Sequence, residues 1–387
     1  MAIKGDSPNP VTAESARLYQ ICTRCIMDTT DPNIQFDEKG VCNHCYTYDE
    51  RVAKYVHTGE TGRRELETLV NRIKQDGAKK QYDCVIGVSG GVDSTFVAYK
   101  IKQLGLRPLA VHLDNGWDSE LAVKNIEQSL KLLKVDLFTR VLDWEEFKDL
   151  QLSFLKASTP DSEIPSDHAI ISIMRYMAKK IGVKYIISGV NVRTESHLPA
   201  AWSQGHLDWR YIASIQKRFG TVKLKTFPHM AYGTQIYFRL TQEWIDILNY
   251  LDYSKQEAVS ILEREIGWKY YGGKHYESIY TRFYQGYWLP RKFKYDKRRT
   301  HLSSLICSGE MTRAQALKVL ESPSYPPTLQ EEDIAYVIKK FGLTNEEFQA
   351  ILDLPARTYE EYSNYLSLSR KLRPLTRLAS RLLRILG

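Results

Sequence analysis

The sequence of 387 residues lacks any apolar run of about 18 residues or more, so no transmembrane helix is expected. Residues 1–20 lack the apolar core of a secretory signal, and we therefore expect a cytoplasmic protein. With 43% hydrophobic residues and only six cysteines, the chain is neither a disordered tail, nor collagen, nor a miniprotein held by disulfides. At roughly 100–200 residues per domain, its length suggests two or three globular domains with sizeable cores.

The net charge of +8 comes mainly from one end of the chain. Residues 370–387 lack acidic side chains and contain six basic ones: Arg370, Lys371, Arg373, Arg377, Arg381 and Arg384. The rest of the chain is nearly neutral, which disfavours a nucleic-acid substrate. On a helical wheel the arginines of the tail lie opposite its leucines. Such a basic amphipathic helix packs on the protein body, docks on a partner or binds an anionic membrane surface, and the sequence leaves all three open.

Four of the six cysteines, Cys22, Cys25, Cys42 and Cys45, form the pattern C-x2-C-x16-C-x2-C. Two such pairs supply the tetrahedral thiolate set that suits a structural Zn²⁺ ion, with an iron–sulfur cluster as the alternative. The turn-rich segment between the pairs has too few apolar residues to fold around a core of its own, so a metal would stabilise it. Disulfides are disfavoured in a cytoplasmic chain. Cys84 and Cys307 are interpreted as packed thiols.

A glycine turn follows the apolar run at residues 82–88. It reads Ser-Gly-Gly-Val-Asp-Ser-Thr over residues 89–95, and a helical pattern begins there. The glycines permit close backbone approach, and the free N–H groups of a helix start attract anions. The pattern is neither a Walker A loop nor a dinucleotide-binding fingerprint. We therefore predict a phosphate site of another type.

This loop resembles the pyrophosphate loop of the PP-loop ATP pyrophosphatases, which cleave ATP to AMP and pyrophosphate while adenylating a substrate oxygen. The resemblance implies a doubly wound parallel α/β sheet, with strands expected at 107–116, 135–141 and 185–192 and helices at 119–133, 144–156 and 167–181. It implies ATP with Mg²⁺, and Asp93 as the residue that helps to hold the ion; capping of the following helix is its other expected role. The ATP-binding residues that it implies are Val88, Ser89, Gly90, Gly91, Asp93, Ser94, Thr95, His112, Asp114, Gly189 and Asn191.

Beyond the loop, the cysteine pairs and the string from Gly272 to Arg313 resemble the N-acetyl sugar amidotransferases of lipopolysaccharide O-antigen biosynthesis. This resemblance, which extends from about residue 21 to 355, implies conversion of the acetamido group of a nucleotide-linked sugar to an acetamidino group. ATP would adenylate the amide oxygen, and ammonia would then displace AMP. A tRNA-modifying PP-loop enzyme, of the thiolase or lysidine-synthetase type, is the alternative.

The basic cluster Lys297-Arg298-Arg299 is expected to clamp phosphates, and the family match favours Lys297 and Arg298 as catalytic residues. Exposure to solvent is the other interpretation of such a charged run. The candidates for substrate binding are Asp167, His168, Glu195, Lys274, His275 and Arg282.

No residue pattern in the chain indicates a glutaminase, because neither Cys84 nor Cys307 shows the paired histidine and exposed turn of a nucleophile. By resemblance, a glutaminase and a cyclase-like barrel are the expected partners and the source of ammonia. Peripheral attachment to the inner face of the membrane through the tail is a further possibility.

We expect a cysteine region at residues 1–60, a PP-loop domain at 61–240, a helical region at 241–369 that contributes substrate-binding segments, and the tail at 370–387. In the helical region, helices are expected at 241–252, 255–266, 313–320, 329–341 and 345–352.

Overall fold

A five-stranded parallel sheet forms the centre of the fold in the computed structural model, which describes residues 18–273 and 276–372. The strands lie in the order β3-β2-β1-β4-β5. Their bounds are β1 Cys84–Gly87, β2 Pro108–Asp114, β3 Asp136–Val141, β4 Tyr185–Ser188 and β5 Glu243–Asp246. All neighbouring pairs are parallel, with Val85 of β1 level with Leu109 of β2 and Ile186 of β4. The predicted doubly wound α/β class is confirmed.

Successive residues of the central strands pack into two different cores, because side chains alternate across a sheet. Val85 and Ile186 belong to a core with α5 (Trp144–Ala157), α6 (Ile164–Lys180) and α8 (Trp209–Phe219). Ile86 and Ile187 pack with α2 (Gly59–Gly77), α3 (Val92–Gln103), α4 (Glu120–Leu133) and α10 (Lys255–Ile266). The other helices up to residue 266 are α1 Asn43–Tyr55, α7 Val192–Glu195 and α9 Tyr232–Thr241.

The C-terminal region is helical, as expected, although its start differs from the prediction. The segment predicted as a helix at 241–252 instead contains β5 and a 3₁₀ turn at Ile247–Tyr250. A short apolar run suits a strand and a buried helix equally well. Here the segment pairs with β4 and therefore forms a strand. The pairing begins at Glu243, whose N–H donates to Lys184 O at 2.9 Å. The later helices are α11 Ile279–Phe283, a π-helical turn Tyr284–Trp288, α12 Leu289–Phe293, α13 Arg298–Ser308, α14 Arg313–Glu321, α15 Pro327–Phe341, α16 Asn345–Leu352 and a 3₁₀ turn Tyr359–Glu361.

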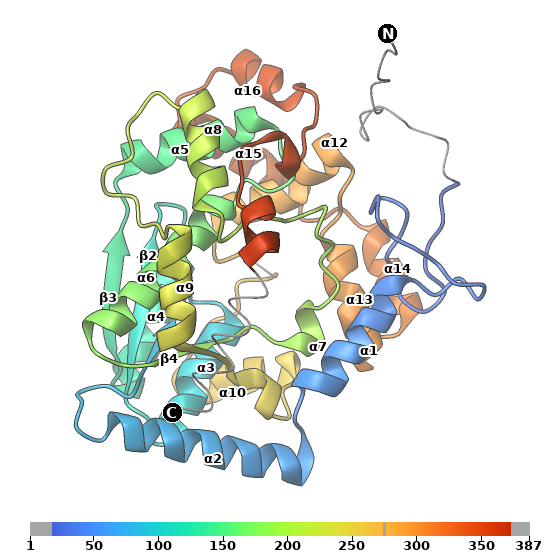
Figure 1. The fold of residues 1–387 in the computed structure, drawn as a ribbon. Helices are drawn as coiled ribbons and strands as arrows, with labels where there is room; N and C mark the ends of the chain where they lie inside the picture. The colour runs from blue at the N-terminus through green and yellow to red at the C-terminus, as the bar shows by residue number, and fades with distance from the viewer. Residues whose placement is uncertain (1–17, 274–275, 373–387) are drawn as a thin grey trace.

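Segments far apart in sequence meet beside the sheet. Figure 1 shows α1, in blue, lying next to α13 and α14, in orange, and α1 contacts both α7 and α13. Ile26, from the cysteine segment, packs on Leu302 of α13 and Ala316 of α14. The cysteine segment thus has a partner surface in the C-terminal helices. The four domain boundaries remain a prediction.

The strand order creates a crevice at the carboxyl ends of β1 and β4. The chain runs from β1 to β2 and β3 on one side of the sheet, and then returns to β4 on the other side of β1. Ligands of open α/β sheets bind at such a switch point. The glycine turn after β1 and the residues that follow β4 both lie there.

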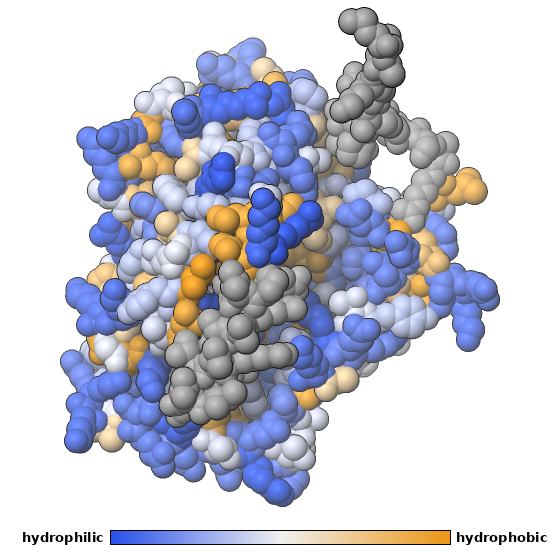
Figure 2. Space-filling model, in the orientation of Figure 1, coloured by the Kyte–Doolittle hydropathy of each residue, from blue (hydrophilic) through white to orange (hydrophobic). Residues whose placement is uncertain are grey.

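The exterior is mainly hydrophilic on the face drawn in Figure 2, with apolar side chains gathered near its centre. Among the described residues, no helix is both long and apolar enough to cross a membrane.

Candidate functional site

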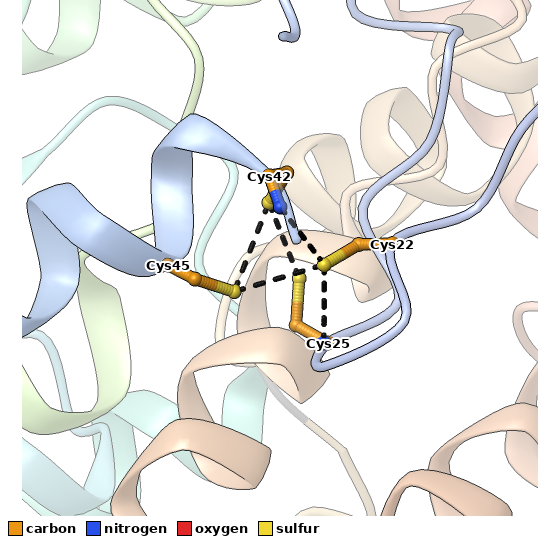
Figure 3. Close-up of side chains that lie close together, drawn as sticks. All are labelled: Cys22, Cys25, Cys42 and Cys45. Carbon is orange, nitrogen blue, oxygen red and sulfur yellow. Dashed lines mark hydrogen bonds between the residues drawn. The ribbon is translucent and has the colours of Figure 1, made fainter. Parts of the chain in front are cut away.

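The four paired cysteines converge on one point, as their spacing predicts (Figure 3). Their sulfur atoms lie 3.6 Å apart for Cys25 and Cys42, and 3.8 Å apart for Cys45 with each of Cys22 and Cys42. A tetrahedral ion with Zn–S bonds of about 2.3 Å requires S···S edges of about 3.8 Å. All four side chains are fully buried. The set therefore fits Zn²⁺.

Backbone amides point at these sulfurs, as they do around metal-bound thiolates. Cys25 N–H donates to Cys22 Sγ at 3.4 Å, and Cys42 N–H donates to the same sulfur at 3.2 Å. The guanidinium of Arg313 donates to the carbonyl oxygens of Cys22 and Cys25, at 3.0 Å from each. The C-terminal helices thereby hold the metal-binding turn in place.

The glycine turn adopts the geometry of a phosphate loop. Gly90 has φ +78°, and a Cβ there would lie 2.6 Å from Ala122 O, so only glycine fits. The Ser94 hydroxyl accepts from Ser89 N–H at 3.2 Å and closes the turn at the start of α3.

A later segment lies over this turn. Trp268 Nε1–H donates to Gly90 O at 2.9 Å, and the Tyr271 hydroxyl accepts from Val92 N–H at 3.2 Å. A phosphate that used the Val92 N–H would therefore have to displace the Tyr271 hydroxyl.

The residues after β4 complete the crevice. A Cβ on Gly189 would lie 3.0 Å from the carbonyl carbon of Asp93. Asn191 caps α7 by accepting from Thr194 N–H at 2.9 Å. The Asn191 Nδ2 group is buried without a hydrogen-bond partner among the described residues. An unsatisfied buried donor at this point fits an anionic ligand.

The expected ATP residues of β2 lie on the other side of the turn. His112 and Asp114 line a cavity of about 360 Å³ between β2, β3 and α4, and Val88 is buried beside them. His112 Nδ1–H donates to Val88 O at 2.9 Å, and its Nε2 lies 3.2 Å from Asp118. Burial opposes the charge of His112, but Asp118 raises its pKa.

Asp93 lies in the first turn of α3, and its carboxylate accepts from the Tyr253 hydroxyl. Burial raises the pKa of Tyr253, and the nearby carboxylates of Asp93 and Glu195 raise it further. Mg²⁺ in nucleotide sites binds one or two carboxylates together with phosphate oxygens. The Asp93 carboxylate therefore fits a magnesium ion, which it would hold together with phosphate oxygens.

Three of the six predicted substrate-binding residues and both predicted basic catalytic residues come together in one cavity of about 560 Å³. The predicted residues in its wall are Asp167, Glu195, Arg282, Lys297 and Arg298. Tyr276 also lines this cavity, and the next residue, Glu277, lies beside the phosphate loop. A Cβ on Gly91 of that loop would lie 3.4 Å from Glu277 Oε1. The cavity thus adjoins the phosphate loop.

A network of charged side chains lies behind this cavity. Lys297 Nζ lies 3.7 Å from Glu163, and His206 Nε2 lies 3.4 Å from Asp167 and 3.7 Å from Asp161. Desolvation raises the pKa of Asp167 to about 6. Burial would lower the pKa values of Lys297 and His206, but the surrounding carboxylates raise both. The site therefore holds a buried ammonium and a carboxyl whose pKa is raised.

The three consecutive basic residues at the start of α13 do not form one phosphate clamp. Only Lys297 joins the charged network; Arg298 donates to Asp296 at 2.7 Å and to Ser322 O at 2.7 Å. Arg299 pairs with the buried Asp28 at 3.0 Å. Consecutive helical residues point in different directions, which separates the cluster. The catalytic role of Arg298 remains a prediction.

Arg282 is also engaged within the protein. Its guanidinium makes two hydrogen bonds of 2.7 Å to the buried Asp333 of α15, and it lies 5.1 Å from the ring of Tyr276. It therefore positions Tyr276 in the cavity wall.

His168 lies beneath the site and not in the cavity wall. Its Nδ1–H donates to His206 O at 2.9 Å, and its Nε2 accepts from Met230 N–H at 3.0 Å. Burial lowers its pKa to about 4, so the ring is neutral. Lys274 and His275, and the tail beyond residue 372, lie outside the described residues.

Several residues of the site carry no local sequence signal. Asp161, Glu163 and His206 supply the charges around Lys297 and Asp167, while His301 and Gln285 line the cavity. Cys307 was expected to be a simple packed thiol, but its sulfur lies 4.0 Å from Cys45 Sγ and 3.7 Å from His197 Nε2. Cys84 is buried in β1 as expected, and burial raises its pKa.

Comparison with known proteins gives one family match, over residues 277–373, to the family described as "LPS biosynthesis protein WbpG-like, C-terminal domain". No curated protein matches the chain. Solved structures with similarity include an NH3-dependent NAD synthetase from Campylobacter jejuni (14% identity, TM-score 0.32, covering 73% of this chain and 97% of that one). An NMN synthetase from Francisella tularensis also matches (14% identity, TM-score 0.28, covering 55% and 90%). The matched segment supplies Arg282, Lys297 and Arg298 of the cavity wall, and it is similar to the WbpG-like C-terminal domain family of lipopolysaccharide biosynthesis.

Proposed function

We propose that this protein is an ATP-dependent amidotransferase that converts the acetamido group of a nucleotide-linked N-acetyl sugar to an acetamidino group in O-antigen biosynthesis. One observation carries the proposal. The phosphate loop at the switch point adjoins a cavity whose wall includes Lys297, from the segment that matches a lipopolysaccharide-biosynthesis family.

An amide carbonyl is a poor electrophile, so its oxygen must first become a leaving group. In the proposed reaction, the amide oxygen attacks the α-phosphorus of ATP, and the bond to pyrophosphate breaks. The amides and hydroxyls of Ser89, Gly91 and Ser94 bind the departing pyrophosphate. Mg²⁺, held by Asp93, would offset phosphate charge. Lys297 would stabilise the negative charge that develops in the cavity.

Ammonia then attacks the activated carbon, and AMP leaves with the former carbonyl oxygen. The nitrogen must lose a proton in this step. Asp167 and His206, which lie 3.4 Å apart at the cavity, would accept it, and the pKa of Asp167, raised to about 6, supports this role.

An isotope experiment tests the whole sequence. The purified protein is incubated with ATP, Mg²⁺, ammonium and a panel of nucleotide-linked acetamido sugars labelled with ¹⁸O in the amide carbonyl. We expect AMP that carries the heavy oxygen, and a sugar product in which NH has replaced O. Formation of ADP, or AMP without label, contradicts the mechanism. Release of AMP with tRNA and with no sugar of the panel would favour the tRNA-modifying alternative.

The nitrogen source is a separate part of the proposal. We propose that a glutaminase and a cyclase-like subunit deliver ammonia, because the chain shows no glutaminase pattern. The purified chain should then use ammonium but not glutamine, and it should gain glutamine-dependent activity when such subunits are added. Equal use of glutamine by the chain alone contradicts this part and leaves the sugar chemistry intact.

A further inference from the structure

We propose a second metal site beside the four-cysteine site, formed by Cys45, His197 and Cys307, which would hold a thiophilic divalent ion such as Zn²⁺. The three ligand atoms lie within 4.8 Å of one another. Cys307 Sγ is 4.0 Å from Cys45 Sγ and 3.7 Å from His197 Nε2. Ligand atoms of a tetrahedral zinc ion with one nitrogen and several sulfur donors are separated by about 3.5–3.8 Å. Small side-chain adjustments therefore suffice for binding.

A hydrogen bond to Ser304 determines which ring nitrogen of His197 carries the proton. The Ser304 hydroxyl uses its only hydrogen to donate to Thr300 O at 3.1 Å. It must therefore accept from His197 Nδ1–H, which lies 2.9 Å away. The Nε2 atom is then the one with the lone pair, and it faces Cys307. An imidazole whose distal N–H is fixed by a hydrogen bond is the usual form of a metal-binding histidine.

Cys45 is common to both sites. Its sulfur lies 3.8 Å from Cys22 and Cys42 on one side and 4.0 Å from Cys307 on the other. A thiolate has lone pairs for two metal ions, so Cys45 can bridge them. Cys45 and His197 are fully buried, and the Tyr48 ring lies 5.2 Å from the imidazole. Such burial excludes competing water from two of the three ligands.

Cys45 lies in α1 and Cys307 lies in α13, whereas His197 directly follows the C-cap residue of α7. The ion would thus tie together three elements that meet beside the large cavity, whose wall includes His197 and Thr300. Three protein ligands leave a fourth coordination position for water or another ligand, as in zinc sites that do chemistry. This distinguishes the second site from the closed four-cysteine site.

Metal counting tests the proposal on the full-length chain. The protein is prepared without metal under reducing, anaerobic conditions, saturated with zinc sulfate and desalted. Native mass spectrometry and elemental analysis then count the bound ions. We expect two zinc ions per wild-type chain, and one in Cys307→Ala and in His197→Ala. Cys84→Ala, which removes a cysteine away from both sites, should retain two.

Cobalt supplies a second readout, whose first arm uses only the wild-type chain. Titration of the wild-type chain with Co²⁺ should show two phases of thiolate-to-cobalt absorption, and Cys307→Ala should lack one of them. One zinc ion in the saturated wild-type chain overturns the proposal, as do two ions retained in both variants. A Cys307→Ala chain that binds no zinc also overturns it, because Cys307 would then belong to the first site.

Discussion

Gly189, at the end of β4, packs directly against the backbone of Asp93 in the phosphate loop, and a Cβ at Gly189 would lie 3.0 Å from the Asp93 carbonyl carbon. This contact sets the width of the crevice between β1 and β4. We expect Gly189→Ala to displace the loop by a few tenths of an ångström and to lower kcat/KM for ATP roughly tenfold, because small displacements of reacting groups are costly. AMP release under varied ATP measures the effect.

The matched control is Gly233→Ala, since a Cβ at Gly233 in α9 meets no atom within 4 Å. It should leave kcat/KM unchanged. Equal activity of Gly189→Ala and wild type would mean that the crevice is not the ATP site.

Lys297 pairs with Glu163, and the charges of Asp161 and Asp167 also act on it. Its side chain is 16% exposed, so Lys297→Met should destabilise the fold by about 3–5 kcal/mol by stranding buried negative charge. It should also lower the rate of AMP formation about 100-fold or more. Urea unfolding and AMP release measure the two effects separately.

A double variant separates the contribution of Lys297 to charge balance in the folded protein from its contribution to the reaction. Adding Glu163→Gln to Lys297→Met removes one stranded carboxylate and should recover part of the stability without recovering activity. Recovery of both would show that Lys297 has only a structural role.

The raised pKa of Asp167 predicts a pH-dependent effect on stability. In the unfolded chain the carboxyl of Asp167 has a pKa of about 4, whereas in the folded protein its pKa is about 6. Between these pH values the folded state binds a proton that the unfolded state has lost. The free energy of unfolding therefore falls as pH rises from 4 to 6. Asp167→Asn removes the effect, and its stability relative to wild type should therefore increase from pH 4 to pH 7. Because the side chain is 45% exposed, we expect a gain below about 1 kcal/mol.

Urea unfolding at both pH values measures this difference. Asp252→Asn, at an exposed carboxylate, is the control. A relative stability of Asp167→Asn that falls between pH 4 and pH 7 would contradict the assignment.

Zinc removal should affect elements far from the cysteines in sequence. Arg313 and Arg299 tie α14 and α13 to the cysteine segment, so Cys42→Ser should lose bound zinc and loosen these helices as well. Metal binding in such segments is worth on the order of 10 kcal/mol. Elemental analysis, thermal unfolding and limited proteolysis should show zinc loss, a lower Tm and new cleavage in both regions. Visible absorption and bound iron in the wild type would instead indicate an iron–sulfur cluster.

The basic tail gives a prediction for sedimentation with anionic vesicles. If the arginine-rich helix binds membranes, the full chain should pellet with the vesicles and a chain that ends at Ser369 should not. Added salt should weaken the binding. Equal pelleting of the two chains excludes the tail as a membrane anchor.

Local patterns predicted the parts of the fold that depend on neighbouring residues. Short apolar runs identified β1, β2, β3 and β4 to within a few residues, and periodicity identified α16 at its observed bounds. The exception was the segment at 241–252, where pairing with β4 overrode a helical pattern. An edge strand of four residues has too short a pattern to be distinguished from a helix turn.

The site was predicted in part. Sequence motifs and resemblance named Asp93, Lys297 and Arg282 as candidates, and the structure places Lys297 and Arg282 in one cavity wall beside the phosphate loop of Asp93. The motifs and the resemblance did not indicate His206 or Glu163. The charges of these two residues change the pKa values of Asp167 and Lys297. Such effects depend on distance in space, and neither residue belongs to a recognisable spacing.

The sequence by itself determined the four-cysteine set and the phosphate loop, because both depend on residues close together along the chain, where backbone geometry sets the distances. Tertiary packing decided the rest. Because of this packing, Lys297, Arg298 and Arg299 pair with three different carboxylates. The same packing brings Cys45, His197 and Cys307 together from three separate segments. Spacing along the chain carries no information about these contacts, because they form only when distant helices pack against one another.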